Sequence, residues 1–277
     1  MDNQKIIGVI DSGVGGLSVV EAIKQLMPSQ EIIYVADPLH FPYGEKTSIE
    51  LMNLVRPFIL FLQSCGVSVV VTACGTVSAL CLEELRKEFS LPIVGILEPA
   101  SRETIRITRE KKVVILATHA TVKAGTFGNV LRTMDSEIEI YEEAWPELIM
   151  AVERGDFNTL KWKKWVSQKF SLFHRRGIDT VILGCTHFAL IWWFFEELAE
   201  GRLFIVNPAQ ACARELKEVL GVEFNARAQN GKISVFVRGN RASFQKTLQS
   251  IPLSLSNLEI ASFPSPIALG EEVRYAR

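Results

Sequence analysis

Short runs of Val, Ile and Leu alternate along this chain with longer segments whose apolar residues recur every three or four positions. Runs of the first kind are typical of buried parallel strands, and segments of the second kind are typical of helices that pack on a sheet through one face. The alternation predicts an α/β fold with mostly parallel strands flanked by helices. The predicted strands are residues 5–10, 31–36, 67–73, 93–97, 113–117, 137–141, 180–184 and 203–206.

The clearest predicted helix covers residues 48–64, where Leu51, Val55, Phe58 and Leu62 follow the spacing of one buried face. Pro57 lies inside this segment and is expected to kink it. After residue 206 the pattern becomes irregular. It predicts a helix over 209–220, a strand over 232–237 and a helix over 244–251.

Two distant segments resemble each other, residues 66–76 (GVSVVVTACGT) and 177–187 (GIDTVILGCTH). In each, a Cys follows a Gly by eight residues, and the strand ending near Asp11 has a weaker counterpart at residues 113–118. One interpretation is chance similarity among hydrophobic strands. The other is two related halves. Because ligands bind beyond the carboxyl ends of parallel strands, facing halves would direct Cys74 and Cys185 toward one site.

Length and charge narrow the class of ligand. A chain of 277 residues predicts one large or two small domains. Lys and Arg number 30 against 31 Asp and Glu, and this net charge of -1 argues against nucleic acid as a partner. Five cysteines, an odd number, indicate free thiols in a reducing compartment. With no signal-like start and no membrane-spanning apolar run, a cytoplasmic protein with a small-molecule ligand is expected.

A glycine-rich turn follows the first predicted strand, with the sequence Asp-Ser-Gly-Val-Gly-Gly over residues 11–16. Such turns can hold an anion through backbone N–H groups at a helix start. A dinucleotide fingerprint requires a third Gly where Ser18 stands, and Asp11 would repel a pyrophosphate. A nucleotide site is therefore disfavoured, and a turn without ligand is the simpler interpretation of this motif alone.

Cysteines at strand-to-helix turns gain from nearby backbone N–H groups, which favour the thiolate. Cys74 and Cys185 are both predicted there, and His187 is the one histidine in such a turn beside a cysteine. Three other cysteines fall in predicted helices and are assigned no chemistry: Cys65, Cys81 and Cys212. The histidines show no metal-ligand spacing, so no metal is expected. The aromatic run at residues 190–195 is core or a subunit contact, with core favoured, so a homodimer stays open.

Taken in order over residues 6–210, the motifs resemble those of the glutamate racemases, cofactor-independent members of the aspartate/glutamate racemase family. The motifs are Asp11-Ser12 before the glycine turn, Pro42-Tyr43-Gly44, Cys74-x-Thr76, Thr118-x-x-Thr121-Val122, Glu153 after a Trp-Pro segment, and Gly184-Cys185-Thr186-His187. The resemblance implies two pseudo-symmetric α/β domains, residues 1–98 plus 209–277 and residues 99–208, with an amino-acid substrate between them.

The resemblance also implies a mechanism without a cofactor. Cys185 would remove the Cα proton of the L-isomer while Cys74 supplies a new proton, with the reverse for the D-isomer. Asp11 would assist Cys74, whereas Glu153 and His187 would assist Cys185. Substrate-binding residues would be Ser12, Pro42, Tyr43, Gly44, Gly75, Thr76, Thr118, Thr121 and Thr186. The D-glutamate formed would serve peptidoglycan synthesis, and desolvation with aligned donors would stabilise the carbanion.

Several positions depart from the family pattern. Gly75 stands where an Asn is usual, and the loss of that amide is expected to leave space for water or a larger substrate group. Trp145 replaces a common Cys, Ala189 a common Pro, residues 207–208 a common Asp-Ser, and Pro38 a usual Thr. Two alternatives therefore stay open beside glutamate racemisation: a racemase of another amino acid such as aspartate, and a catalytically weak binding or regulatory homologue.

Overall fold

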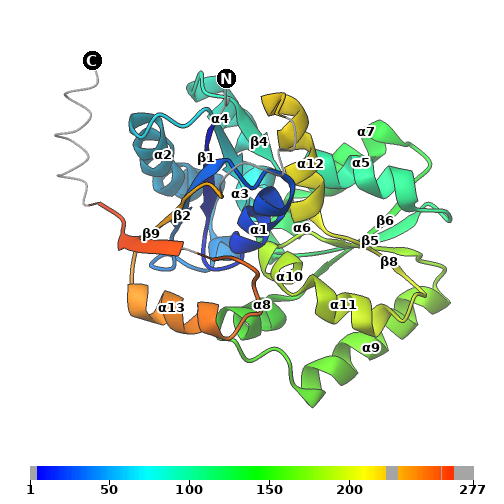
Figure 1. Cartoon of the computed structure of the whole chain (residues 1–277). Coiled ribbons are helices and arrows are strands. Elements are labelled where there is room, and N and C mark those ends of the chain that lie inside the picture. The colour runs from blue at the N-terminus through cyan, green and yellow to red at the C-terminus, as the bar shows by residue number, and fades with distance from the viewer. Residues whose placement is uncertain (1–4, 223–229, 257, 265–277) are drawn as a thin grey trace.

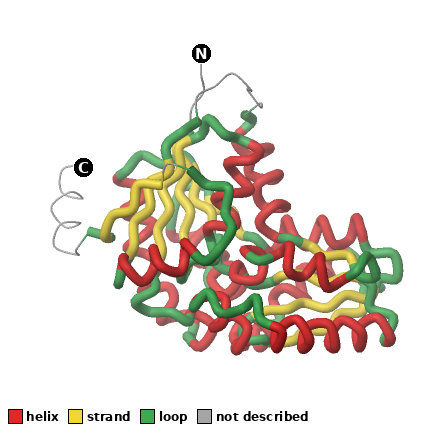
Figure 2. Tube along the Cα trace, turned by 60° about the horizontal axis from the view of Figure 1, so that its bottom comes forward, coloured by secondary structure: helices red, strands yellow, loops and turns green. Residues whose placement is uncertain are grey.

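The strands form two separate parallel sheets in the computed structural model, which describes residues 5–222, 230–256 and 258–264. Six strands form the first sheet in the order β10-β9-β2-β1-β3-β4, and four form the second in the order β6-β5-β7-β8. Figure 2 shows the two groups of strands with helices around them. The α/β class predicted from the apolar pattern is confirmed.

Most strand bounds match the predicted runs within one to three residues. The first sheet contains β1 (Ile6–Asp11), β2 (Glu31–Ala36), β3 (Val69–Thr72), β4 (Ile93–Gly95), β9 (Ile233–Val237) and β10 (Leu258–Ser262). The second sheet contains β5 (Lys112–Ala117), β6 (Glu139–Ala144), β7 (Thr180–Leu183) and β8 (Phe204–Val206).

Helices connect the strands and cover the sheets, as Figure 1 shows. They are α1 (Leu17–Leu26), α2 (Ser48–Ser64), α3 (Gly75–Leu80), α4 (Leu82–Glu88), α5 (Leu97–Ile107), α6 (His119–Ala124), α7 (Thr126–Met134), α8 (Pro146–Glu153), α9 (Leu160–Arg175), α10 (Thr186–Leu190), α11 (Trp192–Ala199), α12 (Pro208–Leu220) and α13 (Arg241–Gln249), with a 3₁₀ turn η1 (Tyr43–Glu45). A capping box between Thr47 and Glu50 starts α2, which continues through Pro57 to Ser64.

Four strands of the first sheet, β2-β1-β3-β4, have the same order as the four strands of the second, which supports the interpretation of two related halves. In the first sheet β1 pairs with β2 and β3, and β3 pairs with β4. In the second sheet β5 pairs in the same way with β6 and β7, and β7 pairs with β8. Cys74 follows β3 and Cys185 follows β7, so the two cysteines hold equivalent positions. The domain limits at residues 98/99 and 208/209 stay a prediction.

Helix α12 joins the halves, since it packs against α1 beside the first sheet and against α5. The aromatic run 190–195 is largely core, because Phe194 and Phe195 are fully buried, although Trp192 is partly exposed. Trp145 is also buried and packs edge-on against Trp165. Among the described residues, none of the helices is both long and apolar enough to cross a bilayer.

Two predictions at the level of elements were wrong in detail, and one strand was missed. The run 93–97 is a shorter strand, because α5 begins at Leu97. Cys65 and Cys81 lie at helix ends instead of inside helices. Strand β10 was not predicted, since its sequence Leu-Glu-Ile-Ala-Ser is short and only half-buried at the edge of the sheet.

Candidate active site

The glycine-rich turn folds around a carboxylate of the chain itself. Strand β1 ends at Asp11, and its Oδ2 accepts the backbone N–H groups of Gly13 at 3.2 Å and of Gly16 at 3.0 Å. Those N–H groups are the ones that would otherwise hold an anionic ligand. Ser12 is buried in the same turn. The contacts agree with the sequence argument against a nucleotide phosphate here.

Asp11 also reaches the other half of the molecule. Its Oδ1 accepts the hydroxyl of Thr186, at the start of α10, at 3.2 Å. Burial raises the pKa of Asp11 to about 6, although the positive charge of His187 and the three hydrogen bonds oppose that rise. Asp11 therefore titrates in a range where most aspartates are fully ionised.

His187 connects a thiol to a carboxylate. Its Nδ1 lies 3.8 Å from Sγ of Cys185, and its Nε2 lies 2.7 Å from Oε2 of Glu153, the last residue of α8. Burial alone lowers the pKa of His187, but its hydrogen bonds with Cys185 and Glu153 outweigh burial and raise it well above the ordinary value. The side chain of His187 is 1% exposed and that of Glu153 is 16% exposed. The imidazolium is therefore enclosed, while the Glu153 carboxylate is partly accessible to solvent. The backbone N–H of Val14 completes the group by pointing at Glu153 Oε2 from 3.4 Å.

Cys74 has a different electrostatic environment. Burial raises its pKa well above the usual thiol value, and the negative charges of Asp11 and Cys185 raise it further, although N–H groups of Val77 and Thr76 oppose them. The N–H groups at the start of α3 favour the thiolate of Cys74, as expected at a strand-to-helix turn, but they do not decide its net pKa. The helix donors are present, but desolvation and the adjacent carboxylate are stronger.

The first half contacts the second through four glycines that leave no room for a side chain. A Cβ on Gly75 would lie 2.2 Å from the carbonyl oxygen of Gly184, and the neighbours of the other three are also atoms of the second half. Those pairs are Gly13 with Glu153, Gly15 with Thr186 and His187, and Gly44 with Thr118. The residue after Cys74 thus touches the residue before Cys185. The space expected at Gly75 is occupied by the Gly184 carbonyl, so that expectation is corrected.

Three threonine hydroxyls form a second junction between the halves. Oγ1 of Thr118 lies 3.0 Å from Oγ1 of Thr76 and 3.0 Å from Oγ1 of Thr121. Thr118 also caps α6 by accepting the N–H of Thr121. The hydroxyls can exchange donor and acceptor roles, so they can turn toward a carboxylate or an ammonium group.

Tyr43 contacts a buried carboxylate that also binds an imidazole, and the sequence motifs assigned no role to either group. It follows Pro42 at the start of η1, and its hydroxyl donates to Oδ2 of Asp37 at 2.8 Å. His40 Nδ1 lies 2.9 Å from the other oxygen of the same carboxylate. In the sequence, this contact could have been suggested by the spacing of Asp37, His40 and Tyr43 at every third residue. The same spacing also occurs in plain loops, and only the burial of Asp37 and Tyr43 distinguishes the two. Burial raises the pKa of Tyr43 well above its usual value, with the charge of Asp37 next in importance.

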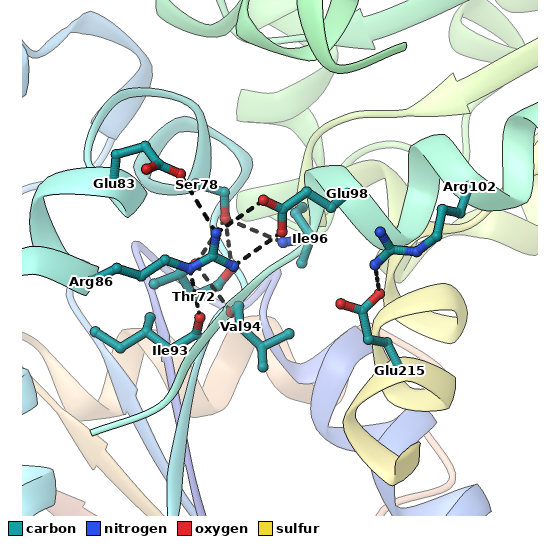
Figure 3. Close-up of polar contacts among 10 residues, drawn as sticks. All are labelled: Thr72, Ser78, Glu83, Arg86, Ile93, Val94, Ile96, Glu98, Arg102 and Glu215. Carbon is teal, nitrogen blue, oxygen red and sulfur yellow. Dashed lines mark hydrogen bonds and ion pairs between the residues drawn. The ribbon is translucent and has the colours of Figure 1, made fainter. Parts of the chain in front are cut away.

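A buried polar network fixes the helix that follows Cys74 (Figure 3). The Ser78 hydroxyl donates to the carbonyl oxygen of Thr72 at 2.8 Å and lies 2.9 Å from the Thr72 hydroxyl. The backbone N–H of Ile96 points at Ser78 Oγ from 3.4 Å. Beside it, Arg86 bridges to Glu98 through two bonds of 3.0 Å. Strand β3, helix α3 and the start of α5 are thereby held together around the turn that carries Cys74.

The two thiols lie in unlike environments, an arrangement that is chemically suited to proton transfer. Cys74, 5% exposed, is kept as a thiol by burial, while Cys185, 7% exposed, faces an imidazolium. Over the residues that the structure describes, no cluster of three or more His, Cys, Asp or Glu side chains has the arrangement of a metal site. The site residues proposed from the sequence all lie around the junction of the two halves, with Ser12 and Pro42 placed by their neighbours in the chain rather than by a side-chain contact of their own.

Comparisons with known proteins agree with this architecture. The model of the Asp/Glu/Hydantoin racemase family matches residues 7–216. A glutamate racemase of Desulforudis audaxviator is 35% identical over 208 residues, covering 75% of this chain and 76% of that protein. The crystal structure of a glutamate racemase isoform from Bacillus anthracis has a TM-score of 0.84 at 28% identity, covering 95% and 99% of the two chains. An aspartate racemase of Picrophilus torridus shares the fold, with a TM-score of 0.59, 21% identity and coverage of 80% and 96%.

Proposed function

The chain belongs to the Asp/Glu/Hydantoin racemase family, and we propose that it interconverts L- and D-glutamate by proton transfer through Cys74 and Cys185. One observation carries this proposal. Gly75 touches Gly184, so the turns that hold the two cysteines meet at equivalent ends of the two related halves. Inversion at Cα needs a base on one face and an acid on the other, and two opposed thiols supply both.

The electrostatics of the two thiols suit opposite roles in the resting enzyme. Cys74 retains its proton, because burial and the Asp11 carboxylate disfavour its thiolate. A thiolate at Cys185 would be paired with the His187 imidazolium. In this state Cys185 removes the Cα proton of L-glutamate and Cys74 donates its own proton to the opposite face. The product is D-glutamate, with the proton now on Cys185 and the charge on Cys74, so the next D-isomer is converted by the reverse transfer.

The remaining site residues bind and orient the substrate in this proposal. Thr76, Thr118 and Thr121 form one set of hydroxyls, and Ser12 and Thr186 lie beside Asp11 on the other side. Tyr43 and Gly44, which follow Pro42, close the site near Thr118. Donors already aligned before the reaction would stabilise the negative charge that develops on the substrate at no cost in reorganisation.

The proposed biological role is to supply D-glutamate for peptidoglycan, and thereby for cell-wall growth and cell shape, in the cytoplasm. Support comes from the relatives, since the glutamate racemase of Desulforudis audaxviator matches three quarters of the chain. Five cysteines without a disulfide among the described residues are compatible with a reducing compartment.

A second candidate substrate is an amino acid with a shorter side chain, such as aspartate. The contact between Gly75 and the carbonyl of Gly184 favours it, because a residue without Cβ lets the two halves approach more closely than an Asn would. A closer approach leaves less depth for the substrate.

Circular dichroism on L- and D-glutamate, and then on aspartate and other amino acids, tests the proposal. We expect the optical signal of either glutamate enantiomer to decay to zero. Decay with aspartate but not glutamate would favour the second candidate. No decay with any amino acid, from protein that binds glutamate in calorimetry, would indicate a binding homologue.

A further inference from the structure

Helix α13 lies against the end of α8, as Figure 1 shows, although the two belong to different halves. Helix α13 connects β9 and β10 of the first sheet, whereas α8 follows β6 of the second. The hydroxyl of Thr247 donates to the backbone carbonyl of Glu153 at 2.9 Å. Two residues beyond Glu153, Gly155 adopts a left-handed φ of +73° directly under Ser250. The last turn of α8 is therefore tied to α13.

The bonded carbonyl belongs to the residue whose side chain holds His187. Glu153 is the last residue of α8, and the final carbonyls of a helix have no partner within it. Its carboxylate lies 2.7 Å from Nε2 of His187, whose other nitrogen lies 3.8 Å from Sγ of Cys185. A change in the direction of the Glu153 backbone would move the carboxylate away from the imidazole.

The Glu153 side chain is partly exposed, at 16%. A cavity of about 520 Å³ lies beside it, lined by Phe41, Arg154, Phe244 and Thr247 in addition to Glu153. Phe41 packs on the imidazole of His187 with ring centroids 5.2 Å apart. The imidazole is thus held by packing, whereas the Glu153 carboxylate borders the cavity, and its position depends on the Glu153 backbone together with the contacts to His187 and the N–H of Val14.

We propose that Thr247 is a positioning residue that fixes the backbone of Glu153 and so keeps its carboxylate on His187 beside Cys185. The inference rests on the proposed function, in which Cys185 exchanges a proton with the substrate. Thr247 touches no reacting atom and acts through Glu153. Through this contact, helix α13 of the first half supports active-site residues of the second half.

Alkylation of the full-length protein by iodoacetamide tests this role separately from activity. Tandem mass spectrometry after digestion gives the modification rate of Cys185 relative to Cys74 in the same sample. In Thr247→Val, which keeps the size but removes the hydroxyl, we expect the ratio to fall at least threefold, because His187 beside Cys185 loses the carboxylate that keeps it charged. Thr247→Ser should restore the ratio. Ser243→Ala, on the same helix and cavity, is the matched control and should leave it unchanged.

Steady-state kinetics provide the second measurement. The Val variant should lower kcat for glutamate about three- to tenfold with little change in KM, since substrate contacts are intact. Thr247→Ala replaces it if the Val variant unfolds. An unchanged Cys185/Cys74 ratio, an equal fall at both cysteines, or failure of Ser to rescue would overturn the role of Thr247. Lack of racemisation by the wild type would instead contradict the proposed function. The alkylation ratio would still test the positioning role of Thr247.

Discussion

Gly75→Asn, which introduces the amide usual in the family, should impair this enzyme. A Cβ at this position would lie 2.2 Å from the carbonyl oxygen of Gly184, and such contacts are essentially never below 3.0 Å, so the halves must separate by at least about 0.8 Å. The neighbour is backbone that leads directly into Cys185, and it cannot rotate away as a side chain could. A misplacement of about 1 Å can cost about 10²-fold in rate. We therefore expect kcat/KM to fall about 10- to 100-fold, equivalent to about 1.4 to 3 kcal/mol.

The assay is racemisation of L- and D-glutamate followed by circular dichroism, with Gly95→Ala as the control. The added Cβ of that variant meets the end of the Leu82 side chain at 2.5 Å, inside one half, so it should lower the melting temperature with little effect on turnover. If Gly75→Asn instead matched or exceeded the wild type, the Gly184 carbonyl would not limit the approach of the halves. The lost amide would then be the more important effect of Gly75.

Cys74→Ser and Cys185→Ser should each nearly abolish racemisation, and wild-type turnover by both would contradict the two-thiol mechanism. Glu153→Gln should lower kcat from the L-isomer about 10- to 100-fold, because a hydrogen bond to a charged group contributes about 1.5 to 3 kcal/mol. The two enantiomers have equal free energies, so kcat/KM must fall equally in both directions. A normal kcat would refute the role of the Glu153–His187 pair. Asp11→Asn should lower kcat more from the D-isomer, because that direction requires Cys74 to lose its proton and Asn cannot accept a proton as the Asp11 carboxylate can; equal minor losses in both directions would assign Asp11 to structure alone. The pKa of Asp11 is about 6 in the folded state against an ordinary 3.8. Its contribution to the free energy of unfolding is therefore complete below pH 3.8 and is lost as pH rises through about 6, a change of about 3 kcal/mol. Urea unfolding across that pH range should show this loss in the wild type and not in Asp11→Asn.

The sequence predicted the elements better than their contacts. Apolar runs located most of the strands, because burial on both faces of a parallel sheet selects Val and Ile, whereas edge strand β10 lacks that signal. Motif order indicated Asp11, Glu153 and His187, but no spacing could show that Thr186 binds Asp11 across 175 residues. Gly75 illustrates the limit most clearly, since a missing side chain suggests empty space until the backbone of the other half is placed beside it.

Proton transfer by two bases on opposite faces of Cα is the central claim, and one isotope experiment tests it directly. L-glutamate is incubated with the enzyme in D₂O, and the reaction is stopped early so that conversion is low. Mass spectrometry of the separated enantiomers then measures deuterium at Cα. Because Cys74 donates a proton exchanged with solvent while Cys185 holds the proton it removed, we expect deuterium in the D-glutamate formed and almost none in the remaining L-glutamate. Product that retains the original hydrogen, or substrate that exchanges as fast as product forms, would show a single base and contradict the account.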